Sequence, residues 1–437
     1  MDGVGKDGLV ARWQRKLDDS AFWLAVHAAL AAFTAYFCTY AFRRPFSAAG
    51  YADVEFGWSW LSPHLTPKTV FVIAQLIGYG VAKFWGMKFC SEIRRDQLGR
   101  ATLGMIGLAW LALLGFAVLP LPLKIVAIFL NGIPLGTVWG LIVRQLEGRK
   151  VSELLLAALS CSYILASGEV KRVGQWLMAH GVTEFWMPFV TGGLFVPLLF
   201  VAVWMLGLLR PPGQEDILER SARGQLDHEG RHAFLKRFLP GLVLLCLVYL
   251  FLTAYRDFRD NYQSDLFAEM GIHDPAAFSR TERPVAFGVM AALALIFLVK
   301  DNRAALRWVY GLMIGGLVLL GGSTWLYAQG RLGGEMWMIA TGLGAYLAYV
   351  PFGSVLFDRT IAATRFQGTA VFAIYVADAL GYTGSVVVQL YRDFFAPKET
   401  WLGFFQGFST AMAIGGVPLM AIAMVYFLRW KPRGECS

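Results

Sequence analysis

The sequence predicts an all-α membrane protein with about twelve transmembrane helices arranged as two six-helix bundles. Its 437 residues are 57% hydrophobic and only 16% charged, whereas soluble proteins are nearer half apolar and a quarter charged. The apolar residues gather into runs of about 17–25, long enough to cross ~30 Å of hydrocarbon as helices. One long polar stretch, residues 210–237, separates six runs from six.

Each half of the chain contains six expected spans. They lie near residues 21–43, 68–90, 101–120, 122–144, 152–178 and 185–209, and then near residues 238–257, 284–300, 305–327, 335–357, 368–391 and 403–428. The central stretch is polar and opens with Pro211, Pro212 and Gly213. The expected organisation is an N-terminus at 1–20, a first bundle at 21–209, a central loop at 210–237, a second bundle at 238–428 and a C-terminus at 429–437.

The basic residues predict how the chain is oriented. Most of the 39 lysines and arginines fall in the two termini, the central loop and the alternate loops on that side. Because basic residues gather on the cytoplasmic side of membrane proteins, we expect both termini and the central loop to be cytoplasmic. Residues 1–19 are polar, and the first apolar run is long and lacks a small-residue cleavage site. We therefore expect an integral protein of the cell membrane without a cleavable signal peptide.

Composition also excludes several classes of function. We ascribe the net charge of +9 to cytoplasmic loops and lipid headgroups rather than to nucleic acid. The five cysteines contain no CxxC pair, and His228 and His232 have no further ligand cluster beside them, so no disulfide framework or metal site is expected. No nucleophile–base constellation is visible. We expect no enzymatic activity, no cofactor, and a monomer whose partners are a small anionic substrate and membrane lipid.

Two adjacent arginines, Arg43 and Arg44, end the first expected span in the stretch TYAFRRPFSAAGY. A charge at the centre of a membrane helix costs about 2.5–3.5 kcal/mol on insertion scales, so it is kept where it faces water, a partner or an anion. One interpretation is that the pair marks the outer end of the helix and reaches the membrane interface. The other is that it faces a ligand.

Arg256 lies toward the end of the seventh span, as Arg43 does in the first. Six spans, a cytoplasmic loop and six spans match the two-repeat plan of major facilitator transporters, in which substrate binds between the halves. The two arginines then approach one axis from opposite bundles and repel each other unless an anion lies between them. Guanidinium groups are planar bidentate donors that fit phosphate or carboxylate. The pattern is typical of an anion site at the centre of a transporter.

Other charged residues have two interpretations each. Lys83, in GYGVAKFWG, either reaches the cytoplasmic face or supplies a third cation to the cavity. Arg280, Glu282 and Arg283 precede the eighth span, where an exposed loop is expected and the mouth of a cavity is the alternative.

Four charged residues lie inside the fifth and eleventh expected spans. Glu169 and Arg172 are three residues apart, share a helix face, and form one expected ion pair. Lys171 is rotated about 200° around the helix from Glu169, so it is left for the cavity or for Asp378. Asp378, in IYVADALGY, is the unpaired acid of the second half. It either pairs with a cation or carries a proton.

These segments resemble the organophosphate:phosphate antiporters of the major facilitator superfamily, which include the glycerol-3-phosphate and hexose-phosphate transporters. TYAFRRPF is similar to that family's tyrosine-rich stretch ending in Arg-Lys/Arg-x-Phe, which implies a substrate arginine at Arg43 and its basic neighbour at Arg44. GYGVAKF is similar to the family's (S/G)YGxSKF motif and implies a cavity lysine at Lys83. TAYRDF resembles the segment with the second phosphate-binding arginine, here Arg256.

Two further stretches extend the resemblance, and two depart from it. NGIPLGTVWG, from Asn131, is similar to the fourth helix of the family, and GTA at 368–370 with GYTGSVV from Gly381 is similar to the eleventh at a slightly different spacing. The family's fifth helix carries a histidine that this chain lacks in that span. The loop SEIRRDQLGR is a degenerate form of the superfamily's Gly…Asp-Arg…Gly-Arg motif. The resemblance therefore implies the fold more closely than the substrate.

The sequence thus predicts a transporter that exchanges a phosphorylated metabolite for phosphate by alternating access. Arg43 and Arg256 are the expected anion-binding pair, with Lys83 as a supporting charge. Four tyrosines are candidates to donate hydrogen bonds to the organic part of the substrate, or else to pack as interfacial aromatic residues: Tyr40, Tyr79, Tyr255 and Tyr382. A proton-coupled carrier of another organic anion and a transporter-like metabolite sensor are the alternatives.

Overall fold

The protein is described by a computed structural model that covers residues 9–56, 65–146, 152–210, 228–299, 301–357, 359–360 and 371–429. Within these residues the regular elements are helices, which confirms the predicted all-α fold. The long helices of the first half are α2 (Ala21–Tyr40), α3 (Pro67–Glu92), α4 (Leu98–Val118), α5 (Leu121–Leu146), α6 (Ser152–Ala179) and α7 (Met187–Gly207). Those of the second half are α9 (His228–Asn261), α11 (Ala276–Phe297), α12 (Asn302–Ala328), α13 (Gly334–Ser354), α15 (Val371–Phe395) and α16 (Trp401–Leu428).

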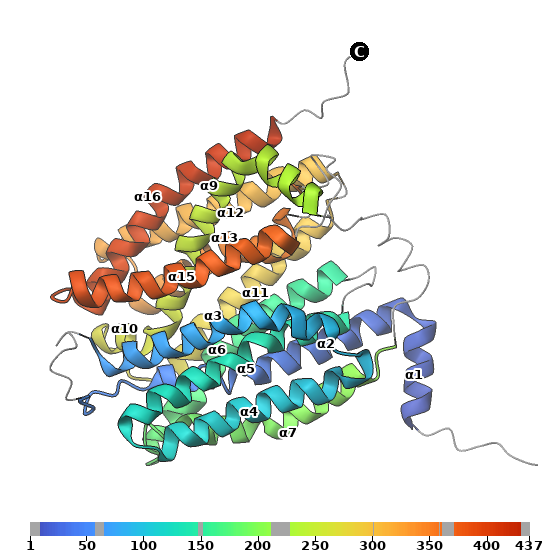
Figure 1. The fold of residues 1–437 in the computed structure, drawn as a ribbon. Coiled ribbons are helices and arrows are strands. Elements are labelled where there is room, and N and C mark those ends of the chain that lie inside the picture. The colour runs from blue at the N-terminus through green and yellow to red at the C-terminus, as the bar shows by residue number, and fades with distance from the viewer. Residues whose placement is uncertain are drawn as a thin grey trace, which may run out of the picture.

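Shorter helical segments join or flank these twelve. They are α1 (Leu9–Asp19), α10 (Gln263–Glu269) and the two 3₁₀ turns η1 (Pro45–Ala48) and η2 (Arg95–Gln97). Figure 1 shows the long helices lying side by side along one direction, with α1 lying crosswise at one edge.

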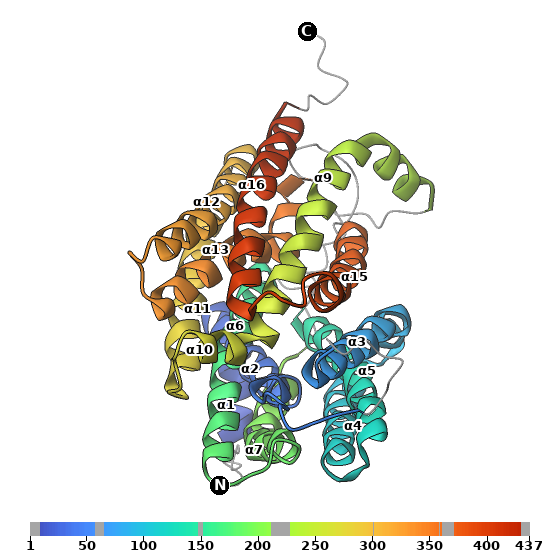
Figure 2. The same ribbon diagram turned by 90° about the vertical axis from the view of Figure 1, so that its left-hand side faces the viewer.

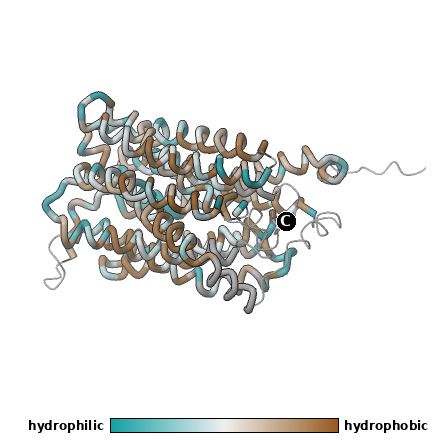
Figure 3. Tube along the Cα trace, turned by 90° about the horizontal axis from the view of Figure 1, so that it is seen from above, coloured by the Kyte–Doolittle hydropathy of each residue, from teal (hydrophilic) through white to brown (hydrophobic). Residues whose placement is uncertain are grey.

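The outer surface identifies an integral membrane protein. Seven of the described helices are long and apolar enough to cross a membrane: α2, α4, α5, α7, α9, α12 and α16. Large apolar side chains face outward from them: Leu111, Leu194 and Ile414 are 62, 57 and 71% exposed. Figure 3 shows hydrophobic residues along the helices and hydrophilic residues in the connections at their ends. Helices of this length with apolar side chains on the outside suit the hydrocarbon of a membrane.

The helices form two groups, α2–α7 and α9–α16, which Figure 2 shows one above the other. We call them the first and second bundle. In the first bundle α3 and α5 approach closely because both carry glycine at the contact. A Cβ added to Gly132 would lie 2.3 Å from the backbone oxygen of Gln75, and one added to Gly78 would lie 2.1 Å from that of Phe129. Small residues permit this close backbone packing in membrane helices.

The two ends of the molecule differ. At one end, which we call the terminal end, α2 begins, α16 ends and α1 lies crosswise (Figure 1). Trp13 of α1 donates a hydrogen bond to His27 of α2 at 3.2 Å, and the other ring nitrogen of His27 lies 2.9 Å from the carbonyl oxygen of Met205 in α7. At the opposite, far end lie η1, α10 and the end of α9.

Several expected boundaries change. α2 stops at Tyr40, and the chain turns through Arg43 and Arg44 into η1, because Pro45 has no N–H with which to continue the helix. α9 starts ten residues before the expected 238 and continues to Asn261, and α11 starts at Ala276 rather than 284. Residues 211–227 of the expected central loop and residues 368–370 of the expected eleventh span lie outside the described residues.

Candidate functional site

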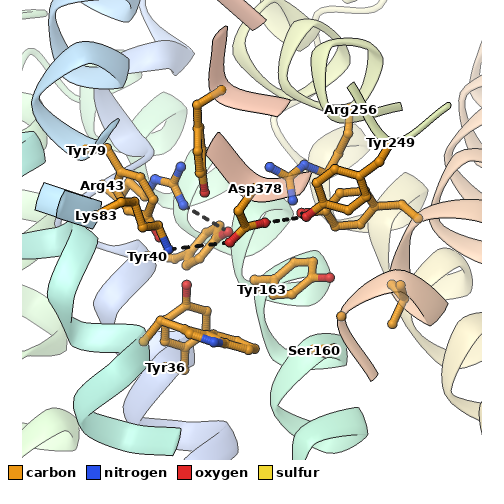
Figure 4. A pocket seen from close by; sticks show the side chains of 15 residues that line it. Tyr36, Tyr40, Arg43, Tyr79, Lys83, Ser160, Tyr163, Tyr249, Arg256 and Asp378 are labelled. Atoms are coloured by element: carbon orange, nitrogen blue, oxygen red, sulfur yellow. Dashed lines mark hydrogen bonds and ion pairs between the residues drawn. The ribbon is translucent and has the colours of Figure 1, made fainter. Parts of the chain in front are cut away.

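A cavity of about 100 Å³ lies between the two bundles. Helices of both bundles contribute to its wall, in which seven of the fifteen residues are tyrosines, three are cations and one is a carboxylate. The lining residues are Tyr36, Tyr40, Arg43, Tyr79, Lys83, Trp139, Ser160, Tyr163, Tyr249, Arg256, Tyr349, Val350, Gly353, Asp378 and Tyr382 (Figure 4). The charged side chains of this wall sum to two positive charges, so the cavity favours an anion.

Arg43 and Arg256 face this cavity from opposite bundles, and both are buried, at 4 and 8% exposure. The guanidinium of Arg43 lies 4.2 Å from the ring centre of Tyr79, and that of Arg256 lies 4.3 Å from the ring centre of Tyr349. Tyrosine faces attract cations and hold a guanidinium in a fixed plane. The structure thus brings together the two arginines that the sequence indicated.

The hydrogen bonding of the two arginines differs. Arg256 Nη2 donates to Asp257 Oδ1 at 2.9 Å. Arg43 Nη1 donates to Tyr40 Oη at 3.4 Å (Figure 4), and Arg43 Nε is buried with no hydrogen-bond partner among the described residues. A buried guanidinium without a paired carboxylate is costly unless a ligand supplies the charge.

Lys83 and Asp378 also meet in the cavity and connect α3 of the first bundle with α15 of the second. Lys83 Nζ lies 3.7 Å from Asp378 Oδ2, and Tyr249 Oη donates to Asp378 Oδ1 at 2.5 Å (Figure 4). The side chains of Lys83 and Asp378 are 18 and 23% exposed, more than either cavity arginine. Lys83 is one helical turn beyond Tyr79 toward the terminal end. This pair therefore lies between the arginines and the terminal end.

Three of the four tyrosines singled out in the sequence line the cavity. The rings of Tyr79 and Tyr382 are 5.1 Å apart, and Tyr40 stacks with Tyr163 at 6.2 Å. Tyr255 is elsewhere: its hydroxyl lies 2.8 Å from Ser409 Oγ, and its ring is buried within the second bundle. On the helix α9, Tyr255 and Arg256 are neighbours and therefore point about 100° apart, so only Arg256 reaches the cavity.

Arg44 likewise points away from the cavity, toward the second bundle. Its Nε lies 2.8 Å from Asp260 Oδ2, and its Nη2 lies 3.3 Å from Asp257 Oδ1. Lys171 Nζ contacts the carboxylate of the same Asp260 and donates to Gln263 Oε1 at 3.0 Å. We call Arg44, Lys171, Asp257 and Asp260 the far-end cluster. Its members are at most 5% exposed, and its cations come from the first bundle while its acids come from the second.

The far-end cluster corrects the expectation for Lys171, which faces neither the cavity nor Asp378. The two acids of the cluster, Asp257 beside Arg44 and Asp260 beside Arg44 and Lys171, were not singled out from the sequence. Their signal was present in TAYRDFRDNY, because two acids three residues apart share one face of a helix. Their cationic partners lie in other helices, however, and no spacing in the sequence indicates that contact.

Two more ion pairs join the bundles around this cluster. Lys68 Nζ lies 2.5 Å from Asp265 Oδ2. Glu169 lies 2.6 Å from Arg283 of α11 and 3.7 Å from Arg172. The expected Glu169–Arg172 pair therefore exists but is the longer of the two contacts. The far end is thus closed by buried and peripheral charge pairs between the bundles.

The charges before the expected eighth span also have defined positions. Arg280 and Arg283 are exposed, at about half of their side-chain surface, as expected for a loop, although both lie in α11. Glu282 is buried and lies 2.8 Å from Arg259 Nη1, so the exposed-loop expectation is wrong for this residue. The helix begins earlier because Arg259 of the neighbouring α9 gives Glu282 a partner inside the bundle.

Comparisons with known proteins agree with this architecture. The sequence profile named "Family of unknown function (DUF5690)" matches residues 45–430. No curated protein matches the sequence.

Solved structures of transporters share the fold at low sequence identity. They include a D-xylose-proton symporter (TM-score 0.59, 15% identity, covering 94% of this chain and 98% of the symporter) and the nucleoside transporter NupG (0.58, 11%, 93% and 100%). A bacterial homolog of the human lysosomal transporter Spinster, in an inward-facing and unoccupied conformation, has a TM-score of 0.61 at 12% identity, with 93 and 99% covered. The chain has the major facilitator fold.

Proposed function

Since the chain belongs to the family of unknown function DUF5690 and has the major facilitator fold, we propose that it is a secondary transporter that carries a small organic anion by alternating access. The observation that carries this proposal is the pair of buried arginines facing one cavity from opposite bundles. Arg43 has a buried Nε without a hydrogen-bond partner among the described residues. An anion bound between Arg43 and Arg256 satisfies this group and joins the two bundles.

The substrate we propose is a phosphorylated metabolite, exchanged for inorganic phosphate. A phosphate monoester carries about −1.5 to −2 charges at neutral pH, which balances the two excess positive charges of the cavity wall. Guanidinium groups bind phosphate oxygens in a bidentate fork. Tyr40, Tyr79 and Tyr382 line the same cavity, where their side chains can contact the organic part. The resemblance of the Arg43, Lys83 and Arg256 segments to the organophosphate:phosphate antiporters supports the same substrate class.

Alternating access in this proposal uses the far-end cluster as one gate. The gate and the binding site occupy consecutive residues, because Arg43 faces the cavity while Arg44 faces the second bundle. On α9, Arg256 faces the cavity and Asp257 faces Arg44. Asp257 Oδ1 contacts both arginines, at 2.9 Å from Arg256 and 3.3 Å from Arg44. An anion that takes over Arg256 releases Asp257 to Arg44, so occupancy of the site is linked to closure of the far end.

The test is counterflow of labelled phosphate in vesicles containing the purified protein. Arg43→Lys and Arg256→Lys keep the charge but lose the bidentate fork, and each should reduce exchange more than tenfold while the protein still folds and inserts. Arg307→Lys, at an exposed position of α12, is the matched control and should exchange normally. Near-normal phosphate exchange by a protein carrying both Arg43→Ala and Arg256→Ala would refute the anion site.

A second candidate, a proton-coupled carrier of another organic anion, is favoured by one observation. Asp378 lies in the cavity between a lysine and a tyrosine hydroxyl, where it can exchange a proton as the bundles move. The two candidates differ in pH dependence. Phosphate exchange should fall as pH drops through about 6, where the dianion is lost. Proton-driven uptake should instead rise with an imposed proton gradient and disappear in Asp378→Asn.

A further inference from the structure

A second cavity, of about 350 Å³, lies at the terminal end of the first bundle. It is formed by η2 and the start of α4 on one side and by the end of α7 on the other. Arg95, Asp96 and Arg100 supply its charged side chains, while Phe200 and Trp204 supply an apolar wall. It shares no residue with the cavity between the bundles.

The charge of this second cavity is positive. Asp96 is already paired with Arg94, whose Nη2 lies 3.3 Å from Asp96 Oδ2. Arg95 Nη2 donates to the backbone oxygens of Gln145 and Arg210 at 3.3 and 3.2 Å, which orients the guanidinium without neutralising it. Arg100 is exposed. Within the part of the chain that the structure describes, the guanidinium charges of Arg95 and Arg100 are therefore not paired with a carboxylate and can meet a ligand.

The apolar wall of the cavity faces the outside of the bundle. Phe200 and Trp204 are 56 and 55% exposed, and they lie in α7, one of the helices long and apolar enough to cross the membrane. Trp204 is three residues from the end of α7 at Gly207, the depth at which tryptophan lies among lipid headgroups. A ligand in this cavity thus meets cationic groups at the membrane surface and hydrocarbon-facing rings below them.

We propose that this cavity binds an anionic phospholipid of the surrounding membrane. Its phosphate lies against Arg95 and Arg100, and its acyl chains run along Phe200 and Trp204. A soluble phosphate ester would use the two arginines but not the outward-facing aromatic wall. The lipid occupies the groove between α4 and α7, which Gly99 of α4 and Val203 of α7 also line. The proposal does not depend on which substrate the protein carries.

The test uses the full-length protein, stripped of lipid in neutral detergent and titrated with phosphatidylglycerol or phosphatidylcholine under native mass spectrometry. We expect one tightly retained phosphatidylglycerol and no comparable phosphatidylcholine. Arg95→Gln combined with Arg100→Gln should weaken retention about tenfold or more, because each basic residue near the membrane surface contributes roughly fivefold. Equal retention of both lipids, or unchanged retention by this variant, would overturn the proposal.

The matched control is Arg303→Gln combined with Arg307→Gln. These exposed arginines lie at the start of α12 beside Trp308, which is 66% exposed, at the terminal end of the second bundle. The two substitutions remove the same number of charges at the same end of the molecule, so phosphatidylglycerol should still be retained. If this control loses the lipid equally, the binding is a general effect of surface charge and the specific site is refuted.

Two single substitutions test the same site with a smaller risk of unfolding the loop. Arg100→Gln alone leaves the Arg95 hydrogen bonds intact and should still weaken retention about fivefold. Trp204→Ala leaves both charges and should weaken retention of phosphatidylglycerol. The effect of soluble glycerol phosphate as a competitor should be the same as in the unchanged protein. Displacement of phosphatidylglycerol by glycerol phosphate at similar concentration would identify a soluble anion as the ligand and end the lipid assignment.

Discussion

At the scale of single residues, the molecule uses consecutive charged positions for different tasks. Arg43 and Arg44 leave the end of α2 in different directions, and Arg256 and Asp257 do the same on α9. One member of each pair faces the cavity, and the other joins the far-end cluster. Asp257 connects the two tasks because its Oδ1 contacts Arg256 and Arg44, while its Oδ2 accepts a hydrogen bond from Ser385 at 2.8 Å.

Asp257→Asn tests this connection. This change keeps the shape but removes the carboxylate that Arg44 and Arg256 share. The far end should open more often, because Arg44 loses the charge of Asp257 and keeps the Asp260 carboxylate and the amide oxygen of Asn261 as partners. Anions should bind more tightly, because Arg256 is released. Ser47→Cys reports opening, since Ser47 is buried beneath Ser264 at the far end. Labelling by a thiol reagent should be several-fold faster in the protein with both Ser47→Cys and Asp257→Asn than in the protein with Ser47→Cys alone. Equal labelling rates would contradict the shared role of Asp257.

At the scale of helices, α6 and α11 join the bundles through Glu169 and Arg283. The side chain of Arg283 is 52% exposed, so the pair contributes about 0.2–1 kcal/mol, whereas breaking the buried Arg44–Asp260 contact costs about 3–5 kcal/mol. In double-mutant cycles on thermal unfolding, Glu169→Gln should couple to Arg283→Gln more strongly than to Arg172→Gln. A larger coupling to Arg172 would mean that the intrahelical contact is the principal one.

The helices differ in how well the sequence predicts them. Apolar runs predict α4, α5, α7, α12 and α16 closely, because insertion into hydrocarbon depends on composition over a local window. Arg43, Lys83 and Asp378 are conspicuous because each interrupts such a run. Glu282 and Asp260 lie in segments that are more polar than the apolar runs, so the sequence predicts helix ends or loops there. Their burial depends on Arg259 and Lys171, and the Lys171–Asp260 contact joins positions 89 residues apart, a distance that local periodicity does not reach.

At the scale of the whole molecule, the far end is closed and the cavity lies on its terminal side, which corresponds to one of the two states of the alternating-access cycle that we propose. The orientation of that state depends on which end is cytoplasmic. The two ends of α12 provide a test, because Arg303 and Gln329 are exposed at the terminal and far ends of the same helix. In intact cells an impermeant thiol reagent should label Gln329→Cys and not Arg303→Cys. The reverse pattern would place the termini outside.

The position of Asp257 also constrains kinetics. In the proposed cycle, the Asp257 carboxylate competes with the substrate anion for Arg256 and so weakens affinity. The same carboxylate holds Arg44 and so slows reopening of the far end. Apparent affinity and turnover are therefore not independently adjustable at this position. Substitutions that loosen Asp257, such as Ser385→Ala, should lower the half-saturating concentration and raise the rate of the opening step together. A series of variants around this carboxylate should then fall on one line when the logarithms of the two quantities are compared, as in a linear free-energy relationship.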